Sequence, residues 1–225
     1  MPRQRRLDKG EKVYHVLNRA NGRLGIFKTA QDFAAFEAVL AEGVQRFGMR
    51  LCGYCLMSNH WHLVLWPRHD GDLSAFMKWI TATHSHRWHT AHKTIGIGHV
   101  YQGRYKSFPV QSNGYYLTLM RYVESNPRRA DLVRQSRRWA WSSLAIRTGA
   151  DTDKPIALSD GPVPLPKNWP AWVDGIGVEE VEAIDICLHR GRPLGQDQWV
   201  QKTAKELSLE SSLNPRGRPR KAENK

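Results

Sequence analysis

The sequence predicts an α+β fold of the ferredoxin-like type, in which the order β-α-β-β-α-β builds a sandwich with an antiparallel sheet. Two observations support this prediction. Segments rich in Val, Tyr and Leu and segments with apolar residues at helical spacing follow one another as strand, helix, strand, strand, helix, strand. In addition, only Ser58 and Asn59 separate the second and third strands, as in a tight hairpin. The helices of such a sandwich cover one face of the sheet, and we expect the other face to be free for a ligand.

The first strand is expected at residues 11–19, and a loop with two glycines follows it at 20–25. Thr29 and Asp32 form a capping pair at the start of the first helix, and Gly48 ends this helix. The apolar face of the helix is expected to consist of residues at helical spacing: Phe33, Phe36, Leu40 and Phe47.

The second and third strands are expected at residues 49–57 and 60–67. Asp72 can cap the second helix, whose buried face is expected to contain Leu73, Phe76, Met77 and Ile80. The fourth strand is expected at 104–110, where Pro109 indicates an edge of the sheet because proline cannot donate a hydrogen bond.

A further helix is expected at residues 113–125, because the proline of Asn126-Pro127 discourages its continuation. Beyond it, a region rich in Pro, Gly and Asp predicts a linker, and two helical patterns at 177–189 and 195–208 follow. The chain is therefore expected to have four parts: a domain at 1–148 that begins with a loose basic arm, a linker at 149–174, a small helical appendage at 175–210 and a disordered basic tail at 211–225.

The composition indicates a polyanionic partner. The 34 Lys and Arg residues exceed the 21 Asp and Glu residues, which gives a formal net charge of +13. This excess favours nucleic acid over the alternatives, an anionic membrane surface or a merely solubilising charge. No apolar run is long enough to span a membrane, the first twelve residues lack a signal-peptide core, and three cysteines fit a reducing compartment. We therefore expect a cytoplasmic protein.

His60 and His62 alternate along the third strand, which places both imidazoles on one face about 7 Å apart. Such a pair can bind one divalent cation and leave coordination positions open for a substrate oxygen. The pattern by itself is weak, and two polar residues on a half-exposed strand remain the alternative.

Two other groups of candidate ligands are less favoured. Cys52 and Cys55 could form a structural zinc site with the nearby histidines, but a spacing of three along a strand points the two thiols to opposite faces, so two small core residues are the better interpretation. The second histidine group is expected on a basic helix that faces nucleic acid, without a catalytic role: His84, His86, His89 and His92.

Tyr122 is the candidate nucleophile. A tyrosine hydroxyl has a pKa near 10 and becomes competent towards a phosphodiester when a metal ion stabilises charge on the phosphate oxygens. Asn126 lies four residues later on the same helical face, and its amide oxygen could be a third metal ligand. The alternative is an aromatic helix that packs on the sheet, in which Tyr115 and Tyr116 are core or rim residues.

Three sequence blocks carry a resemblance to a known family: YHVLNR at 14–19, YQGRYKS at 101–107 and LMRYVESNP at 119–127, together with His60-Trp61-His62. Over about residues 10–145 the chain resembles the single-tyrosine HUH transposases of the IS200-like type, and among them the subgroup associated with repetitive extragenic palindromes (REP). The resemblance implies that His60, His62 and Asn126 bind Mg²⁺ or Mn²⁺. Tyr122 would then form a 5′-phosphotyrosine link and release a free 3′-OH. The blocks also suggest the residues that contact DNA: Asn18, Arg19, Arg104 and Lys106.

The basic tail carries a motif of its own, because Arg190-Gly191-Arg192-Pro193 recurs at 216–219. The second copy looks like an AT-hook, which binds the minor groove of A·T-rich duplex, and a generic basic tail is the equal alternative. Its DNA-binding candidates are Arg216, Arg218, Arg220 and Lys221. Such an extension favours the REP-associated subgroup, which acts on single-stranded hairpins and often as a monomer, whereas the compact enzymes are homodimers.

The sequence therefore predicts a metal-dependent transposase that cleaves and rejoins single-stranded, hairpin-containing DNA in the cytoplasm, at the nucleoid. A non-catalytic DNA-binding regulator derived from a transposase is the alternative.

Overall fold

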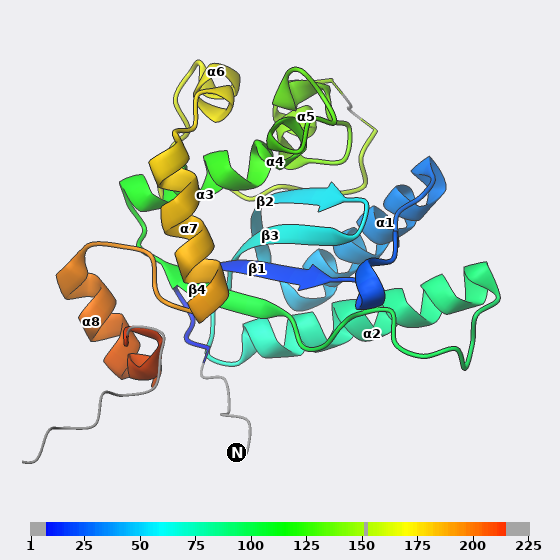
Figure 1. Cartoon of the computed structure of the whole chain (residues 1–225), viewed down its shortest axis with the longest axis horizontal. Helices are drawn as coiled ribbons and strands as arrows, with labels where there is room; N and C mark the ends of the chain where they lie inside the picture. Colours follow the sequence, from blue (N-terminus) through cyan, green and yellow to red (C-terminus); the bar gives the residue numbers. More distant parts are fainter. Residues whose placement is uncertain (1–7, 151–152, 215–225) are drawn as a thin grey trace, which may run out of the picture.

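The computed structural model describes residues 8–150 and 153–214. Its four strands form one antiparallel sheet in the order β2-β3-β1-β4 (Figure 1). The strands are β1 (Val13–Arg19), β2 (Arg50–Met57), β3 (His60–Trp66) and β4 (Lys106–Val110). This order, with two helices inserted at the expected places, confirms the ferredoxin-like fold. The strand with Pro109 lies at the edge, as the sequence predicted.

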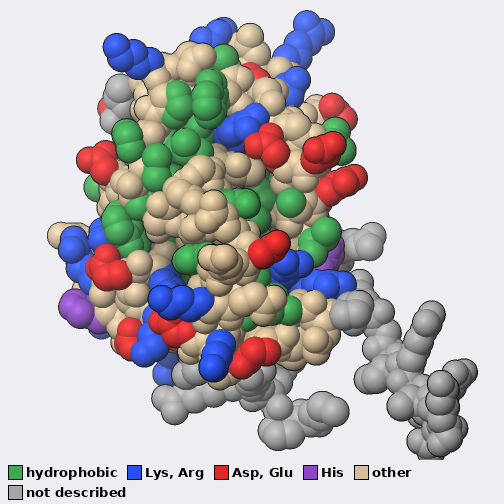
Figure 2. All heavy atoms as spheres, turned by 90° about the vertical axis from the view of Figure 1, so that its left-hand side faces the viewer, with side chains coloured by type: hydrophobic (Ala, Val, Ile, Leu, Met, Phe, Trp, Pro, Cys, Tyr) green, Lys and Arg blue, Asp and Glu red, His purple; other side chains and the backbone are tan. Residues whose placement is uncertain are grey.

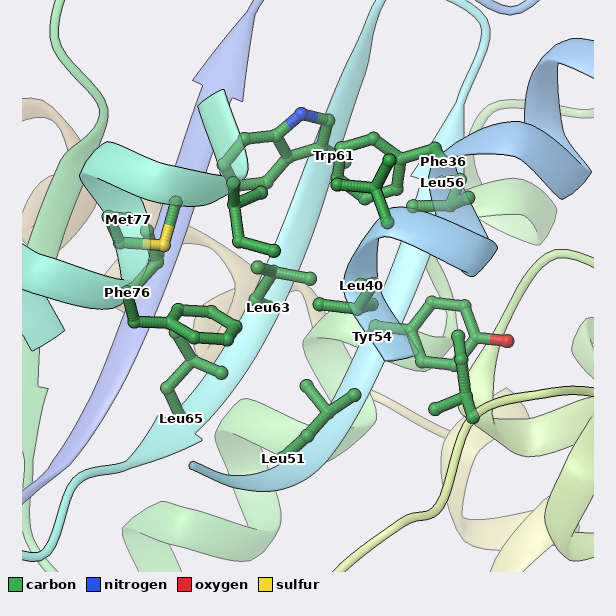
Figure 3. Packing of buried hydrophobic residues seen from close by; sticks show 14 of the residues in the cluster. Phe36, Leu40, Leu51, Tyr54, Leu56, Trp61, Leu63, Leu65, Phe76 and Met77 are labelled. Carbon is green, nitrogen blue, oxygen red and sulfur yellow. The ribbon is translucent and has the colours of Figure 1, made fainter. Parts of the chain in front are cut away.

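One face of the sheet is covered by α1 (Ala30–Phe47) and α2 (Asp72–His92) (Figure 1). The predicted cap at Thr29 and Asp32 is present, and Gly48 ends α1 in the left-handed conformation with φ of 57°. Side chains of both helices interlock with those of β2 and β3 in the first hydrophobic core (Figure 3), whose central members include Phe36, Leu40, Trp61, Leu63 and Phe76.

The other face of the sheet is also covered, so the expectation of a free face is wrong. Helix α3 (Gly114–Glu124) lies across it, and α7 (Val178–Arg190) packs beside α3 (Figure 1). The physical reason is that α3, like α1 and α2, carries apolar side chains that must be buried. These form a second hydrophobic core with β2, β3 and β4 that includes Tyr116, Leu119, Met120 and Val123.

The rest of the chain completes this second layer. Its helices are α4 (Asn126–Arg129), α5 (Ser143–Arg147), α6 (Trp169–Asp174) and α8 (Asp197–Glu206), with short 3₁₀ turns at Asn21–Arg23, Ser136–Arg138 and Glu210–Ser212. Trp169, in the expected linker, and Leu194, in the expected appendage, are buried in the second core. The division of the chain at residues 148 and 174 stays a prediction. Acidic, basic and apolar side chains are interspersed on the face that carries α7 and α8 (Figure 2).

Strand β2 contains an irregularity that the sequence analysis missed. The pairing with β3 shifts between Leu51 and Gly53, so Cys52 is an extra residue in a β-bulge. The bulge reverses the alternation, and Cys52 and Cys55 both lie in the second core instead of on opposite faces. Burial raises the pKa of the Cys52 thiol to about 11. Both cysteines are packed as small core residues.

None of the helices in the described part of the chain is long and apolar enough to cross a membrane.

Candidate active site

The site is built on β3, whose alternation sends Trp61 into the first core and His60 and His62 towards α3. The two imidazole centroids lie 5.1 Å apart with an interplanar angle of 75°. His62 is buried and His60 is half-buried. The structure therefore brings the predicted histidine pair together on one face.

His15 on β1 is a third histidine of this site, which the sequence analysis did not single out. Its Nε2 lies 2.8 Å from Nδ1 of His62, and the two rings stack at 5.0 Å. His60 uses its Nδ1 on the Asn59 side-chain oxygen at 2.6 Å, so its Nε2 keeps a free lone pair. His62 has the same option when its Nδ1 donates to His15. The signal available in the sequence was the strand-like alternation of YHVLNR. Once β1 pairs with β3, this alternation places His15 on the face that carries His62.

Burial keeps these imidazoles neutral. It lowers the pKa of His15 to about 3. Burial, followed by the positive charges of Arg19 and Arg129, lowers the pKa of His60 to about 4. Burial likewise holds the pKa of His62 well below its usual range. A neutral imidazole is the form that donates a lone pair to a metal ion.

Tyr122, on α3, faces the histidines. Its ring centroid lies 5.8 Å from that of His62 and 6.1 Å from that of His15. The side chain is 4% exposed, and its hydroxyl donates a 2.8 Å hydrogen bond to Oδ1 of Asp185 on α7. Burial, reinforced by Asp185, raises the pKa of the hydroxyl. Tyr122 is therefore protonated at rest and already hydrogen-bonded to an acceptor.

Asn126 lies in the first turn of α4, because α3 ends at Glu124. Its Nδ2 donates to the carbonyl oxygens of Tyr122, at 2.9 Å, and Val123, at 3.3 Å. This arrangement ties the amide to the end of the tyrosine helix and leaves Oδ1 as an acceptor. Among the described residues, no hydrogen bond joins Asn126 to His60 or His62.

Arg129 adds positive charge next to the candidate nucleophile. Its guanidinium carbon lies 4.3 Å from the centroid of the Tyr122 ring. The same side chain donates to the Ser125 hydroxyl and to the Tyr122 carbonyl, each at 3.2 Å, which fixes its position. Arg129 was not among the predicted site residues, because the tyrosine helix was expected to end at residue 125, and the structure continues with a helical turn over Asn126–Arg129.

The residues fit a divalent cation in part. Among the described residues, no three His, Cys, Asp or Glu side chains are arranged to hold a metal ion. Two neutral imidazoles and one amide oxygen nevertheless leave several positions open, which suits a cation that also binds substrate oxygens.

The other DNA-binding candidates fall into separate places. Asn18 and Arg104 line one pocket of about 1040 Å³, together with His86 and His89 of α2. Lys106 lines a second pocket, of about 270 Å³. Arg19 ends β1 opposite His60. The tail candidates lie outside the described residues: Arg216, Arg218, Arg220 and Lys221.

The expectation that the whole histidine group of α2 faces nucleic acid is wrong for His84. This side chain is buried in the first layer, and its Nδ1 accepts a 2.7 Å hydrogen bond from the Tyr101 hydroxyl. Trp61 Nε1 donates to the same hydroxyl at 3.0 Å. His84 points inward because it faces the same side of α2 as Ile80, one turn earlier.

Comparisons with known proteins place these findings in context. Residues 10–126, just over half of the chain, match the model of a family described as IS200-like transposase. A solved structure of a REP-associated tyrosine transposase bound to a REP hairpin matches with a TM-score of 0.53 at 17% identity, covering 74% of this chain and 99% of that chain. A proposed transposase from Deinococcus radiodurans R1 aligns at 18% identity with a TM-score of 0.39, covering 59% and 92%. No curated protein sequence matches significantly.

Proposed function

Because the chain belongs to the IS200-like transposase family, we propose that it cleaves and rejoins single-stranded DNA through a 5′-phosphotyrosine intermediate at Tyr122. The observation that carries this proposal is the position of Tyr122 against His62, with ring centroids 5.8 Å apart within one chain. A nucleophile and a candidate metal face sixty residues apart in sequence thus meet without a second subunit. A monomer is sufficient for this arrangement, although a homodimer could also contain it.

His60, His62 and Asn126 would hold Mg²⁺ or Mn²⁺ in the proposed site. When bound, the cation would stabilise negative charge on the scissile phosphate. The chain itself supplies the remaining parts: Tyr122 as nucleophile, and Arg129 as a cation beside the attacked phosphate. His15 would orient His62 through the contact between their ring nitrogens, as partners of metal-binding histidines commonly do.

We propose a single-stranded substrate with a hairpin. A buried nucleophile favours single-stranded DNA, because one flexible strand can reach a buried hydroxyl more readily than a stiff duplex can. The structural relative was solved with a REP hairpin, and the pocket lined by Asn18, Arg104, His86 and His89 offers donors for phosphate and base contacts. Binding of A·T-rich duplex by the tail, and a cytoplasmic, nucleoid-associated location, complete the proposal.

A covalent adduct assay tests the proposed chemistry. The purified chain, Mn²⁺ and a labelled hairpin oligonucleotide with single-stranded flanks should yield a protein–DNA adduct that persists in denaturing gels. Tyr122→Phe should abolish the adduct and leave hairpin binding intact, whereas the matched variant Tyr115→Phe, on the same helix, should form it normally. An adduct that survives in Tyr122→Phe would refute the assignment.

The same assay separates the rival function. A non-catalytic DNA-binding regulator would bind the hairpin and form no adduct with any oligonucleotide or divalent metal. The intact set of Tyr122, His60, His62 and Asn126 favours the enzyme, because a protein that only binds DNA has no need for a nucleophile beside a metal face.

A further inference from the structure

The hydroxyl of Tyr122 is hydrogen-bonded to a carboxylate that has no role in the proposed function so far. Oδ1 of Asp185 accepts its proton at 2.8 Å, within the range in which a general base can remove a proton. Asp185 lies in α7, 63 residues further along the chain, in the segment expected to be an appendage. The contact therefore joins the appendage directly to the candidate nucleophile.

Helix α7 holds Asp185 in a defined position. Arg121, the neighbour of Tyr122, forms a 2.6 Å ion pair with Glu180, one turn before Ile184. Ile184 and Cys187 are buried in the second core against α3. The helix is thus anchored on both sides of Asp185, so the carboxylate meets the hydroxyl without a rearrangement.

The surroundings of Tyr122 create a need for such a group. The hydroxyl is buried, and a tyrosine hydroxyl ordinarily has a pKa near 10, so the phenolate is scarce at neutral pH. Attack therefore requires that the proton be accepted as the new bond forms. Arg129, whose guanidinium carbon lies over the ring at 4.3 Å from its centroid, can stabilise the negative charge that develops on the oxygen.

We propose that Asp185 is a catalytic residue that accepts the proton of Tyr122 during DNA cleavage, an inference that rests on the proposed function. The phenolic oxygen forms a bond to phosphorus as its proton passes to Asp185. The bond from phosphorus to the 3′ oxygen breaks, and this oxygen leaves with the electron pair and takes a proton from water. In the rejoining step the 3′-OH attacks phosphorus and gives up its proton to water. The bond from phosphorus to the phenolic oxygen breaks, and protonated Asp185 returns its proton to that oxygen. Helix α7 is thereby part of the active site.

Chemical rescue tests this role. Asp185→Ala leaves space for a small carboxylate, and single-turnover adduct formation is measured with saturating protein in sodium formate and in sodium chloride at equal ionic strength. We expect the variant to be slower than wild type by about 100-fold or more, the lower limit for loss of a general base. Formate should restore at least tenfold, and chloride should not. Hairpin affinity should stay within about threefold of wild type, since the Asp185 carboxylate is bonded to Tyr122 and offers no positive charge to a phosphate.

Two control variants make the result decisive. Glu182→Ala removes an exposed carboxylate from the same helix and should show neither loss nor rescue. Asp185→Asn keeps a hydrogen-bond acceptor for Tyr122 but is a far weaker base. It should therefore react as slowly as Asp185→Ala, which separates the loss of the base from any loss of stability caused by the alanine. A faster reaction in Asp185→Ala would mean that Asp185 restrains the nucleophile, and a loss that formate does not restore would mean a structural role. Either result overturns the proposal, whereas absence of an adduct in wild type would refute the underlying function.

Discussion

The buried His84 should make the stability of the protein depend on pH. In the folded chain, burial lowers the pKa of this imidazole to about 3 from its ordinary value of 6.5, with Asp32 raising it slightly and His92 lowering it. The unfolded chain therefore binds a proton first as the pH falls. The stabilising contribution is fully present above pH 6.5 and is lost progressively between pH 6.5 and 3. Between pH 7 and pH 5, the loss from this residue alone is about 2 kcal/mol.

His84→Gln isolates this contribution, because the amide oxygen can still accept the hydrogen bond from Tyr101. The free energy of unfolding should be measured by urea titration at pH 7 and pH 5 for both proteins. Other buried histidines contribute equally to both, so the wild type should lose about 2 kcal/mol more than the variant. His86→Gln, exposed on the same helix, should follow the wild type. An equal loss in wild type and His84→Gln would refute the reasoning.

Three further substitutions test other parts of the structure. Gly161→Ala should destabilise the fold by about 1–3 kcal/mol in urea unfolding, because a Cβ would overlap the buried ring of Tyr116; Gly103→Ala, with open space, is the control. Trp169→Phe should cost about 1–3 kcal/mol, because it removes the indole donor to buried Glu124 at 2.6 Å; a loss equal to that of exposed Trp172→Phe would contradict this. Arg104→Gln should weaken hairpin binding and reduce the salt slope by about 0.7, whereas Arg46→Gln, on α1, should not.

Local patterns in the sequence were sufficient to predict the sheet and about half of the residues of the candidate site. Gly48, the two-residue turn after β2 and the alternation of His60 and His62 are all encoded by neighbours in the chain, and the structure contains them. The bulge at Cys52 could not be predicted in this way. It is visible in the shifted pairing with β3, and a single strand read alone gives no sign of it.

The remaining site residues depend on packing between distant segments. Asp185 is one of several acidic residues on an amphipathic helix, and it becomes distinctive when α7 packs on α3. His15 reaches His62 because β1 pairs with β3. Arg129 reaches Tyr122 because α4 follows α3 directly, with Ser125 between them in a right-handed helical conformation. The sequence contains each of these residues, but their meeting depends on tertiary contacts. The assignments of Tyr122, His60, His62 and Asn126 to chemical roles stay predictions.

Several residues that complete the second core lie late in the sequence, which affects how the chain folds during synthesis. The sheet and α3 are encoded by residue 124, yet Leu194, which belongs to the same core as the α3 side chains, lies 71 positions after Val123. At roughly 5–20 residues per second, about 4–14 seconds separate these two residues on the ribosome. During that interval the apolar side chains of α3 lack the later segments that cover them. The first layer can fold early, whereas the layer that buries Tyr122 closes only after residue 194 has left the ribosome.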